Sequence, residues 1–352
     1  MSFKKCGIAF LALILATLIL LGAVTVVIDP FFHYHAPLGA LQYEIFYQRY
    51  QNDGIVKHFD YDAVITGNSL AENFKTSQLD ALFGVHSVKV PFSGATPKEL
   101  DANLRAAFKA NPGIKTVVMN LDYGSFVQDK DALGYDKSDY PDFLYNADPF
   151  DDVKYLFNKS ILVNSLNVLK YTLSGNKTTS FDAYSAWPED TPYGEAVIRA
   201  VYERPQPGGE TFHLNDERYE LLRGNISQNI LETVNAHPDT EFYFFFPPYS
   251  VFFWDKMNRI GELEMQLEAE RAVIELLIDC DNIHLFSFMD DHDLVTDFTR
   301  YKDTIHYDSG INEWMLDCMA KGEHRLTRDN YESYLEKNIG FYTGYDYEGL
   351  LE

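Results

Sequence analysis

The chain has 352 residues and is 46% apolar, enough for one large α/β domain with insertions or for two small domains. Its 53 acidic and 29 basic side chains give a formal net charge of −24. This acidity disfavours nucleic acids and anionic lipid headgroups as partners, because both require a basic surface. Three cysteines are too few for a disulfide scaffold. Cys280 and Cys318 could pair outside the cell or remain two separate buried thiols.

The chain opens with an apolar segment. Residues 7–28 carry no charge and, at about 1.5 Å per residue, could cross a hydrocarbon core of about 30 Å. Lys4 and Lys5 precede the segment, which places the N-terminus in the cytoplasm by the positive-inside rule. We find no signal-peptide cleavage site before Asp29. We therefore expect a signal anchor over residues 1–28, single-pass in the cell membrane, with the C-terminal domain extracytoplasmic. A buried core helix is the alternative.

Five short runs rich in β-branched and aromatic residues follow, separated by helical patterns. Such alternation predicts a parallel sheet covered by helices on its faces. The runs occupy residues 63–66, 87–92, 116–121, 241–246 and 282–287.

Helix signals lie between these runs. Gly84 ends one apolar pattern, and Thr96 with Glu99 forms a capping box that opens a helix to about residue 110. A third helical pattern begins at Asn215 or Asp216, and a fourth spans residues 262–278.

Two stretches interrupt the rhythm of strands and helices. We expect residues 29–58 to form a juxtamembrane segment that packs on a domain spanning residues 59–352. Residues 124–207, with a helical pattern over 153–173, should form an insertion that caps the sheet edge. His33 and His35 could both point one way on an extended segment and bind a metal, but two histidine ligands without a third do not predict a metal site.

A candidate site residue follows each expected strand. Ser69 follows the first, Gly94 the second, Asn120 the third and Tyr249 the fourth, and the Asp303 and His306 pair comes after the fifth. The carboxyl ends of parallel strands share one edge of a sheet, where ligands bind. We therefore expect these residues to converge.

Ser69, His306 and Asp303 form a complete catalytic set. A serine hydroxyl is a weak nucleophile until a histidine accepts its proton and a carboxylate orients that histidine. The three-residue spacing from Asp303 to His306 places both side chains on one face of a turn. Ser69 could instead be a helix cap, since residues 69–72 fit a capping box. Residues 290–292, two aspartates and a histidine, form a rival acid–base cluster.

An acyl-transfer site also needs donors for the oxyanion. The candidates are the backbone N–H groups of Ser69 and Gly94 and the side-chain amide of Asn120, which could instead be a turn residue. We expect the site to be lined by Asn68, Asp122, Tyr123 and Tyr249.

These motifs resemble the SGNH, or GDSL-like, hydrolase superfamily. Residues 67–70 (Gly-Asn-Ser-Leu) are similar to its first block, with Asn68 where the family usually has Asp. Gly94 matches the second block, and residues 303–306 (Asp-Thr-Ile-His) resemble the fifth. Residues 120–122 (Asn-Leu-Asp) stand where the third block has Gly-x-Asn-Asp. The resemblance implies a flavodoxin-like three-layer α/β/α sandwich with a five-stranded parallel sheet, and ester chemistry without metal or cofactor.

The anchored topology is similar to that of extracytoplasmic family members that act on O-acyl esters of surface polymers. This resemblance implies a serine esterase or O-acyltransferase for acyl, chiefly acetyl, esters of cell-envelope carbohydrate, with a membrane-bound acyl-donor protein as a potential partner. Hydrolase and transferase remain open. The alternatives are a non-catalytic assembly or binding protein with the same fold, and a lipase-like enzyme.

Overall fold

The computed structural model describes residues 3–134, 141–146 and 148–351. The chain divides into two compact units. The helical unit comprises residues 1–60 and 135–180, and the sheet unit comprises residues 61–134 and 181–352. The expected insertion over residues 124–207 is therefore divided between the two units. The chain leaves the sheet unit, completes the helical unit and returns.

The sheet unit is an α/β structure built on six strands in the order β2-β1-β3-β4-β5-β6. The first five strands are parallel, and β6 pairs with β5 in the antiparallel direction. The expectation of a five-stranded parallel sheet is wrong in one respect, since it omits the antiparallel strand β6. Strand β6 has only two residues, which is too short to give a recognisable strand pattern in the sequence. The strands are β1 Ala63–Gly67, β2 Ser87–Pro91, β3 Thr116–Asn120, β4 Glu241–Phe246, β5 Ile283–Ser287 and β6 Arg325–Leu326.

The five longer strands confirm the apolar runs to within a residue or two. Every residue of β1, β2 and β3 is buried. Burial on both faces explains why these strands read as continuous apolar runs rather than as alternating patterns.

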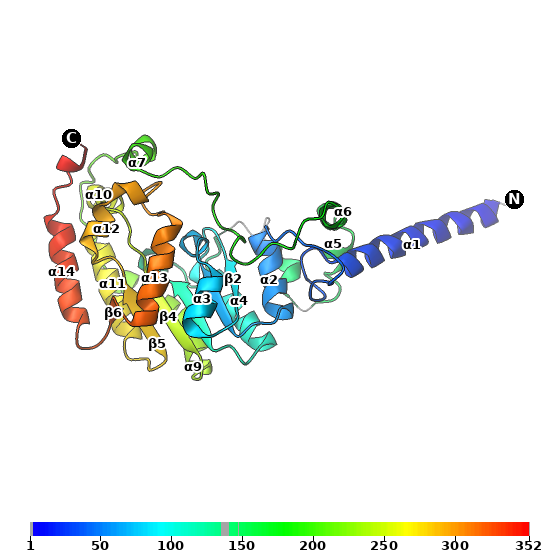
Figure 1. Ribbon diagram of the computed structural model, residues 1–352, viewed down its shortest axis with the longest axis horizontal. Coiled ribbons are helices and arrows are strands. Elements are labelled where there is room, and N and C mark those ends of the chain that lie inside the picture. The colour runs from blue at the N-terminus through cyan, green and yellow to red at the C-terminus, as the bar shows by residue number, and fades with distance from the viewer. Residues whose placement is uncertain (1–2, 135–140, 147, 352) are drawn as a thin grey trace. The chain divides into compact units, whose positions relative to one another are not determined.

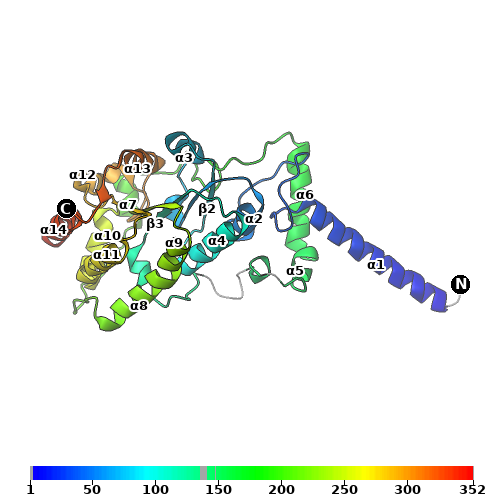
Figure 2. The ribbon, with the colours of Figure 1, turned by 90° about the horizontal axis from the view of Figure 1, so that it is seen from below.

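Helices cover both faces of the sheet (Figure 2). On one face α3 contacts α13, and on the other α4 contacts α9 while α8 contacts α11. The helices of the sheet unit are α3 Thr76–Phe83, α4 Pro97–Ala110, α7 Glu195–Val201, α8 Asp216–Ile226, α9 Glu232–Ala236, α10 Val251–Ile260, α11 Leu263–Leu277, α12 His292–Thr296, α13 Ser309–Lys321 and α14 Tyr331–Gly344.

The structure confirms the predicted ends of three helices. Gly84 ends α3 in the left-handed conformation, at φ +67°. The capping box of Thr96 and Glu99 opens α4. Asn215 rather than Asp216 caps α8, because its side chain accepts the N–H of Arg218. Cys280 and Cys318 are free thiols and do not pair.

The helical unit contains α1 Phe3–Ile28, α2 Gln48–His58, α5 Val153–Leu156 and α6 Lys159–Leu173. Helix α1 is long and apolar enough to cross a membrane, and residues 3–20 are exposed along their whole length (Figure 1). The single helical pattern over 153–173 is two helices, because Asn158 starts α6 by accepting the N–H of Ser160.

A buried lysine joins β2 to the segment that follows β1. The Nζ of Lys89 donates to the carbonyl oxygens of Glu72, Phe74 and Asp182 at 2.5, 3.0 and 3.3 Å. Burial lowers the pKa of Lys89 to about 7, against the opposing charges of Asp182 and Glu72. Through these three hydrogen bonds, Lys89 joins strand β2 to the segment after Ser69 and to Asp182, near the point where the chain re-enters the sheet unit.

Lys89 should make the stability of the sheet unit depend on pH. The folded protein releases this proton at about pH 7, whereas the unfolded chain holds it to about pH 10.5, so the unfolding free energy should rise with pH between these values. The rise should amount to a few kcal/mol in urea unfolding and be missing in Lys89→Met. Lys115→Met, at an exposed lysine, should keep the rise. An unchanged pH dependence in Lys89→Met would contradict this assignment.

Candidate active site

The turn after β1 is built around Gly67. Its φ of +140° is one that side chains other than glycine rarely adopt. A Cβ at this position would lie 2.1 Å from Oδ1 of Asn120, at the end of β3. Glycine therefore permits the close approach of two strand ends. In that approach the Asn68 N–H donates to Asn120 Oδ1 at 3.0 Å.

Ser69 begins a short 3-10 helix, η1 Ser69–Ala71. Asn68 caps this helix, because its Oδ1 accepts the N–H of Leu70 at 3.0 Å. The alternative in which Ser69 caps the helix together with Glu72 is wrong: the Glu72 carboxylate accepts the indole N–H of Trp187 at 2.6 Å. The Ser69 hydroxyl is consequently available for chemistry. A helix of three residues has almost no macrodipole, so the dipole of η1 contributes little to stabilising an oxyanion at Ser69.

The carboxyl and imidazole groups come from one tight hairpin. Tyr301 and Tyr307 form an antiparallel bridge, and the N–H of Lys302 donates to the His306 carbonyl at 3.0 Å. Asp303 Oδ1 accepts the backbone N–H groups of Ile305 and His306 at 3.0 and 2.9 Å. The hairpin thus orients the Asp303 carboxylate through its own backbone.

The structure brings the three catalytic candidates together. Ser69 Oγ lies 2.8 Å from His306 Nε2, and His306 Nδ1 lies 2.7 Å from Asp303 Oδ2. An ionised carboxylate only accepts hydrogen bonds, so the proton belongs on Nδ1 and the neutral ring presents Nε2 to Ser69 as an acceptor. This is the hydrogen-bond order of a serine nucleophile, its base and the carboxylate that orients the base.

Asp303 remains ionised in this arrangement. Burial raises its pKa, but the hydrogen bond and charge of His306 and the N–H groups of Ile305 and His306 outweigh that effect. The pKa of Asp303 is therefore lowered. An ionised Asp303 can stabilise the imidazolium that forms when His306 takes a proton.

Neighbouring elements fix the hairpin. An ion pair between Arg300 and Asp308 closes its base. The carbonyl of Thr304 accepts the hydroxyl of Ser250, in the loop after β4, at 2.8 Å. From α13, which follows the hairpin, the Asn312 amide donates to the Leu70 carbonyl at 2.9 Å. The base and the nucleophile are therefore tied to each other by a second contact besides their own hydrogen bond.

The three oxyanion candidates differ in their surroundings. No hydrogen bond among the described residues occupies the backbone N–H of Ser69 or of Gly94. Gly94 lies in an exposed turn after β2, at φ +64°. Asn120 is buried with its Oδ1 engaged by Asn68, which leaves its NH₂ group as the available donor. All three stand at the carboxyl ends of adjacent strands.

A small pocket lies at the ends of β1 and β3, and its lining includes Asn68 but neither Ser69 nor His306. Its polar side includes Asn68, Asn120 and Asp122, and its apolar side includes Met119, Phe126 and Ile230. Three of the predicted lining residues or oxyanion donors therefore meet in one place.

The other two predicted lining residues behave differently. Tyr249 is buried and does not line the pocket, but its hydroxyl interacts with the carboxylate of Asp122, which does. Burial raises the pKa of Asp122, although this hydroxyl and the N–H groups of Ser125 and Gly124 oppose the rise. The structure does not bring Tyr123 to the site, because its ring packs in the core against Phe246 and Trp254.

Two site residues escaped the sequence analysis. The ring of Trp187 meets the His306 ring edge to face, with centroids 5.2 Å apart. Lys302 Nζ lies 3.4 Å from the centroid of the Trp187 indole. Burial lowers the pKa of Lys302, against the charges of Asp303 and Glu72. Trp187 belongs to the returning part of the expected insertion, and a tryptophan in a polar segment was the only signal for it.

The rival cluster does not form an acid–base pair. Asp290 contacts His324 and Lys337, and His292 stacks on Phe341 with centroids 3.7 Å apart. In the chain as described, no group of three or more His, Cys, Asp or Glu side chains could hold a metal ion. His33 and His35 therefore lack the further ligand that a metal site would need.

Comparison with known proteins yields little. No family model and no curated protein matches the chain. A solved structure described as "a putative platelet activating factor from Streptococcus pneumonia" aligns with 78% of this chain and 90% of its own, at 11% identity and a TM-score of 0.38. A likeness this distant carries no argument about chemistry, which rests on the geometry of the site.

The Gly67 turn supplies a direct test of the site's construction. Gly67→Ala should lower the unfolding free energy by more than about 2 kcal/mol, because backbone strain adds to the clash with Asn120. Gly84→Ala is the matched control, since Gly84 also has a positive φ but no heavy atom within 4 Å of its Cβ position. It should cost only about 1–2 kcal/mol of strain. Equal losses in urea unfolding would show that the close approach to Asn120 is absent.

Proposed function

We propose that this protein is a serine acyl esterase or O-acyltransferase of the SGNH type. The observation that carries the proposal is the continuous hydrogen-bonded relay from Ser69 through His306 to Asp303. The strand order β2-β1-β3-β4-β5 also agrees with a flavodoxin-like three-layer sandwich, in which ligands bind at the carboxyl ends of the strands. Ser69 stands at that edge, directly after β1.

The reaction begins when His306 Nε2 takes the proton of Ser69 Oγ as Oγ bonds to the ester carbonyl carbon. The carbonyl oxygen becomes an oxyanion, for which the N–H groups of Ser69 and Gly94 and the NH₂ of Asn120 are the donors. The intermediate then collapses, the carbon–oxygen bond to the alcohol breaks, and His306 gives its proton to the departing alkoxide. Water or a sugar hydroxyl next attacks the acyl-enzyme, with His306 again as the base, and Ser69 is released.

The proposed acyl group is short, chiefly acetyl, because the resemblance is to family members that act on O-acyl esters of surface polymers. A lipase-like enzyme, which would need a long apolar tunnel beside Ser69, is the alternative. Helix α1 supports a single-pass location with the sheet unit outside the cell, where acylated envelope carbohydrate would be the substrate. A membrane-bound acyl-donor protein would then be the partner of a transferase.

Ser69→Ala tests the proposal. The full chain should hydrolyse p-nitrophenyl acetate, and Ser69→Ala should lower kcat/KM by at least about 10³ because the relay acts as a unit. Ser333→Ala is the matched control, since that hydroxyl lies at the start of α14 and donates only to the Asn330 carbonyl. Product analysis with an acetylated oligosaccharide, with and without an acceptor glycan, then separates hydrolysis from transfer. Full retention of ester turnover in Ser69→Ala would sink the catalytic proposal in favour of a non-catalytic surface partner.

A further inference from the structure

Helix α6 of the helical unit carries apolar side chains on two faces. Ile161, Ser165 and Val168 are buried within the unit. Leu166, Leu169 and Leu173 follow one another at spacings of three and four residues, so they share another face of the helix. We call these three residues the leucine stripe. Leu166 is 60% exposed and Leu173 is 88% exposed. An exposed apolar row of this kind marks an interaction surface.

Helices α5 and α6 are attached to the C-terminal end of α1. The Thr25 hydroxyl donates to the Leu156 carbonyl at 3.2 Å. A Cβ placed on Gly22 would lie 3.9 Å from the ring of Phe157. Figures 1 and 2 agree that α6 runs across the end of α1 rather than along it. If α1 crosses a bilayer, α6 therefore lies near the plane of the membrane surface.

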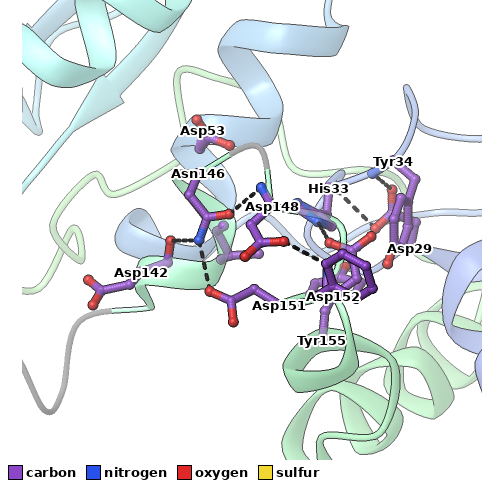
Figure 3. A network of polar contacts seen from close by, with 12 residues as sticks. Asp29, His33, Tyr34, Asp53, Asp142, Asn146, Asp148, Asp151, Asp152 and Tyr155 are labelled. Carbon is purple, nitrogen blue, oxygen red and sulfur yellow. Dashed lines mark hydrogen bonds and ion pairs between the residues drawn. The ribbon is translucent and has the colours of Figure 1, made fainter.

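The junction between α1 and α5 is fixed by Asp29 (Figure 3). This fully buried carboxylate accepts the N–H groups of His33, Tyr34 and His35 at 2.9, 2.7 and 3.0 Å. It also accepts the hydroxyl of Tyr155, on α5, at 2.6 Å. Four hydrogen bonds on one carboxylate hold the exit of α1 and the start of the α5–α6 pair together, so the depth of α1 sets the depth of α6.

Helix geometry places this junction at the membrane boundary. Lys4 and Lys5 mark the cytoplasmic end of α1, and a core of about 30 Å takes about 20 residues of helix. Counted from Cys6, that length ends near Thr25. The contact of Thr25 with Leu156 then lies at the outer boundary, and the contact of Gly22 with Phe157 lies about one turn deeper. Helix α5 therefore ends at the level where acyl chains meet headgroups.

The local charge also fits a lipid surface, although the whole chain is acidic. Residues 153–180 contain no Asp or Glu and include four lysines, Lys154, Lys159, Lys170 and Lys177. Residues 1–28 form another stretch of this length without an acid, and Asp151, just before the segment, pairs with Lys154 at 3.0 Å. Lysines beside an apolar face are typical of helices that lie in the membrane interface, where the ammonium groups reach the headgroups.

We propose that α5 and α6 lie in the outer interface of the lipid bilayer, with the leucine stripe turned into the boundary between headgroups and acyl chains. The protein would then hold the membrane through a surface helix as well as through α1, which keeps the helical unit from tilting freely about its anchor. This inference rests on the proposed membrane span of α1 and is independent of the proposed catalysis.

The test uses the full chain reconstituted in vesicles of phosphatidylcholine and phosphatidylglycerol. Cys6 and Cys280 are changed to serine and Cys318 to alanine, and single cysteines are introduced as Leu166→Cys and Leu173→Cys for a polarity-sensitive fluorophore. Nitroxides on the lipid acyl chains then quench fluorophores at the boundary. The stripe labels should be quenched several-fold more strongly than a matched label at Asn167→Cys, an exposed position on the same helix away from the stripe.

A label at Ile14→Cys, in the middle of α1, reports the span itself. Strong quenching at Ile14 with no more quenching at Leu166 and Leu173 than at Asn167 would overturn the surface assignment while leaving the anchor intact. Absence of quenching at Ile14 would refute the membrane span and the surface assignment together. Ester turnover of the same labelled proteins is measured in parallel, so neither outcome is confused with a failure of the catalytic proposal.

Discussion

The hydrogen bond between Ser69 and His306 joins residues 237 positions apart, and it can form only if the ends of the chain's strands are brought to one edge of the sheet. The parallel order of β2, β1, β3, β4 and β5 does this. These five strands end at the same edge, where the turn after β1 meets the hairpin of Tyr301–Tyr307, which follows β5 after helix α12. The close approach of Gly67 to Asn120 then sets the position of Ser69 relative to β3. The Asn312 contact with Leu70 sets its position relative to the His306 hairpin.

The meeting of Ser69, His306 and Asp303 could be predicted because each residue belongs to a short local pattern. A serine directly after a buried strand, and an Asp and a His three residues apart, are short patterns that can be recognised in the sequence without any knowledge of the fold. The five longer strands were predictable for a related reason: strands buried on both faces must be apolar throughout. Once the strand positions were given, the convergence of Asn68, Asn120 and Asp122 followed from chain order.

What the sequence could not yield depends on contacts between distant segments. Strand β6 has two residues and is created by its pairing with β5. Tyr123 follows β3 like a site residue, but the side chain turns into the core against Trp254. Trp187 reaches His306 only because Asn73 accepts its backbone N–H and Glu72 accepts its indole N–H. The division into units was hidden for the same reason, since residues 135–180 join the first sixty residues through tertiary contacts.

The most direct measurement of the central claim is covalent labelling of the full chain with a fluorophosphonate, followed by intact mass and peptide mapping. An activated Ser69 should take one phosphonyl group, on the peptide that contains Ser69. His306→Ala should abolish the adduct while circular dichroism stays unchanged, because the hydroxyl loses its base. No adduct on the folded protein, or an adduct on Ser69 that forms equally well without His306, would contradict the relay that this account places at the edge of the sheet.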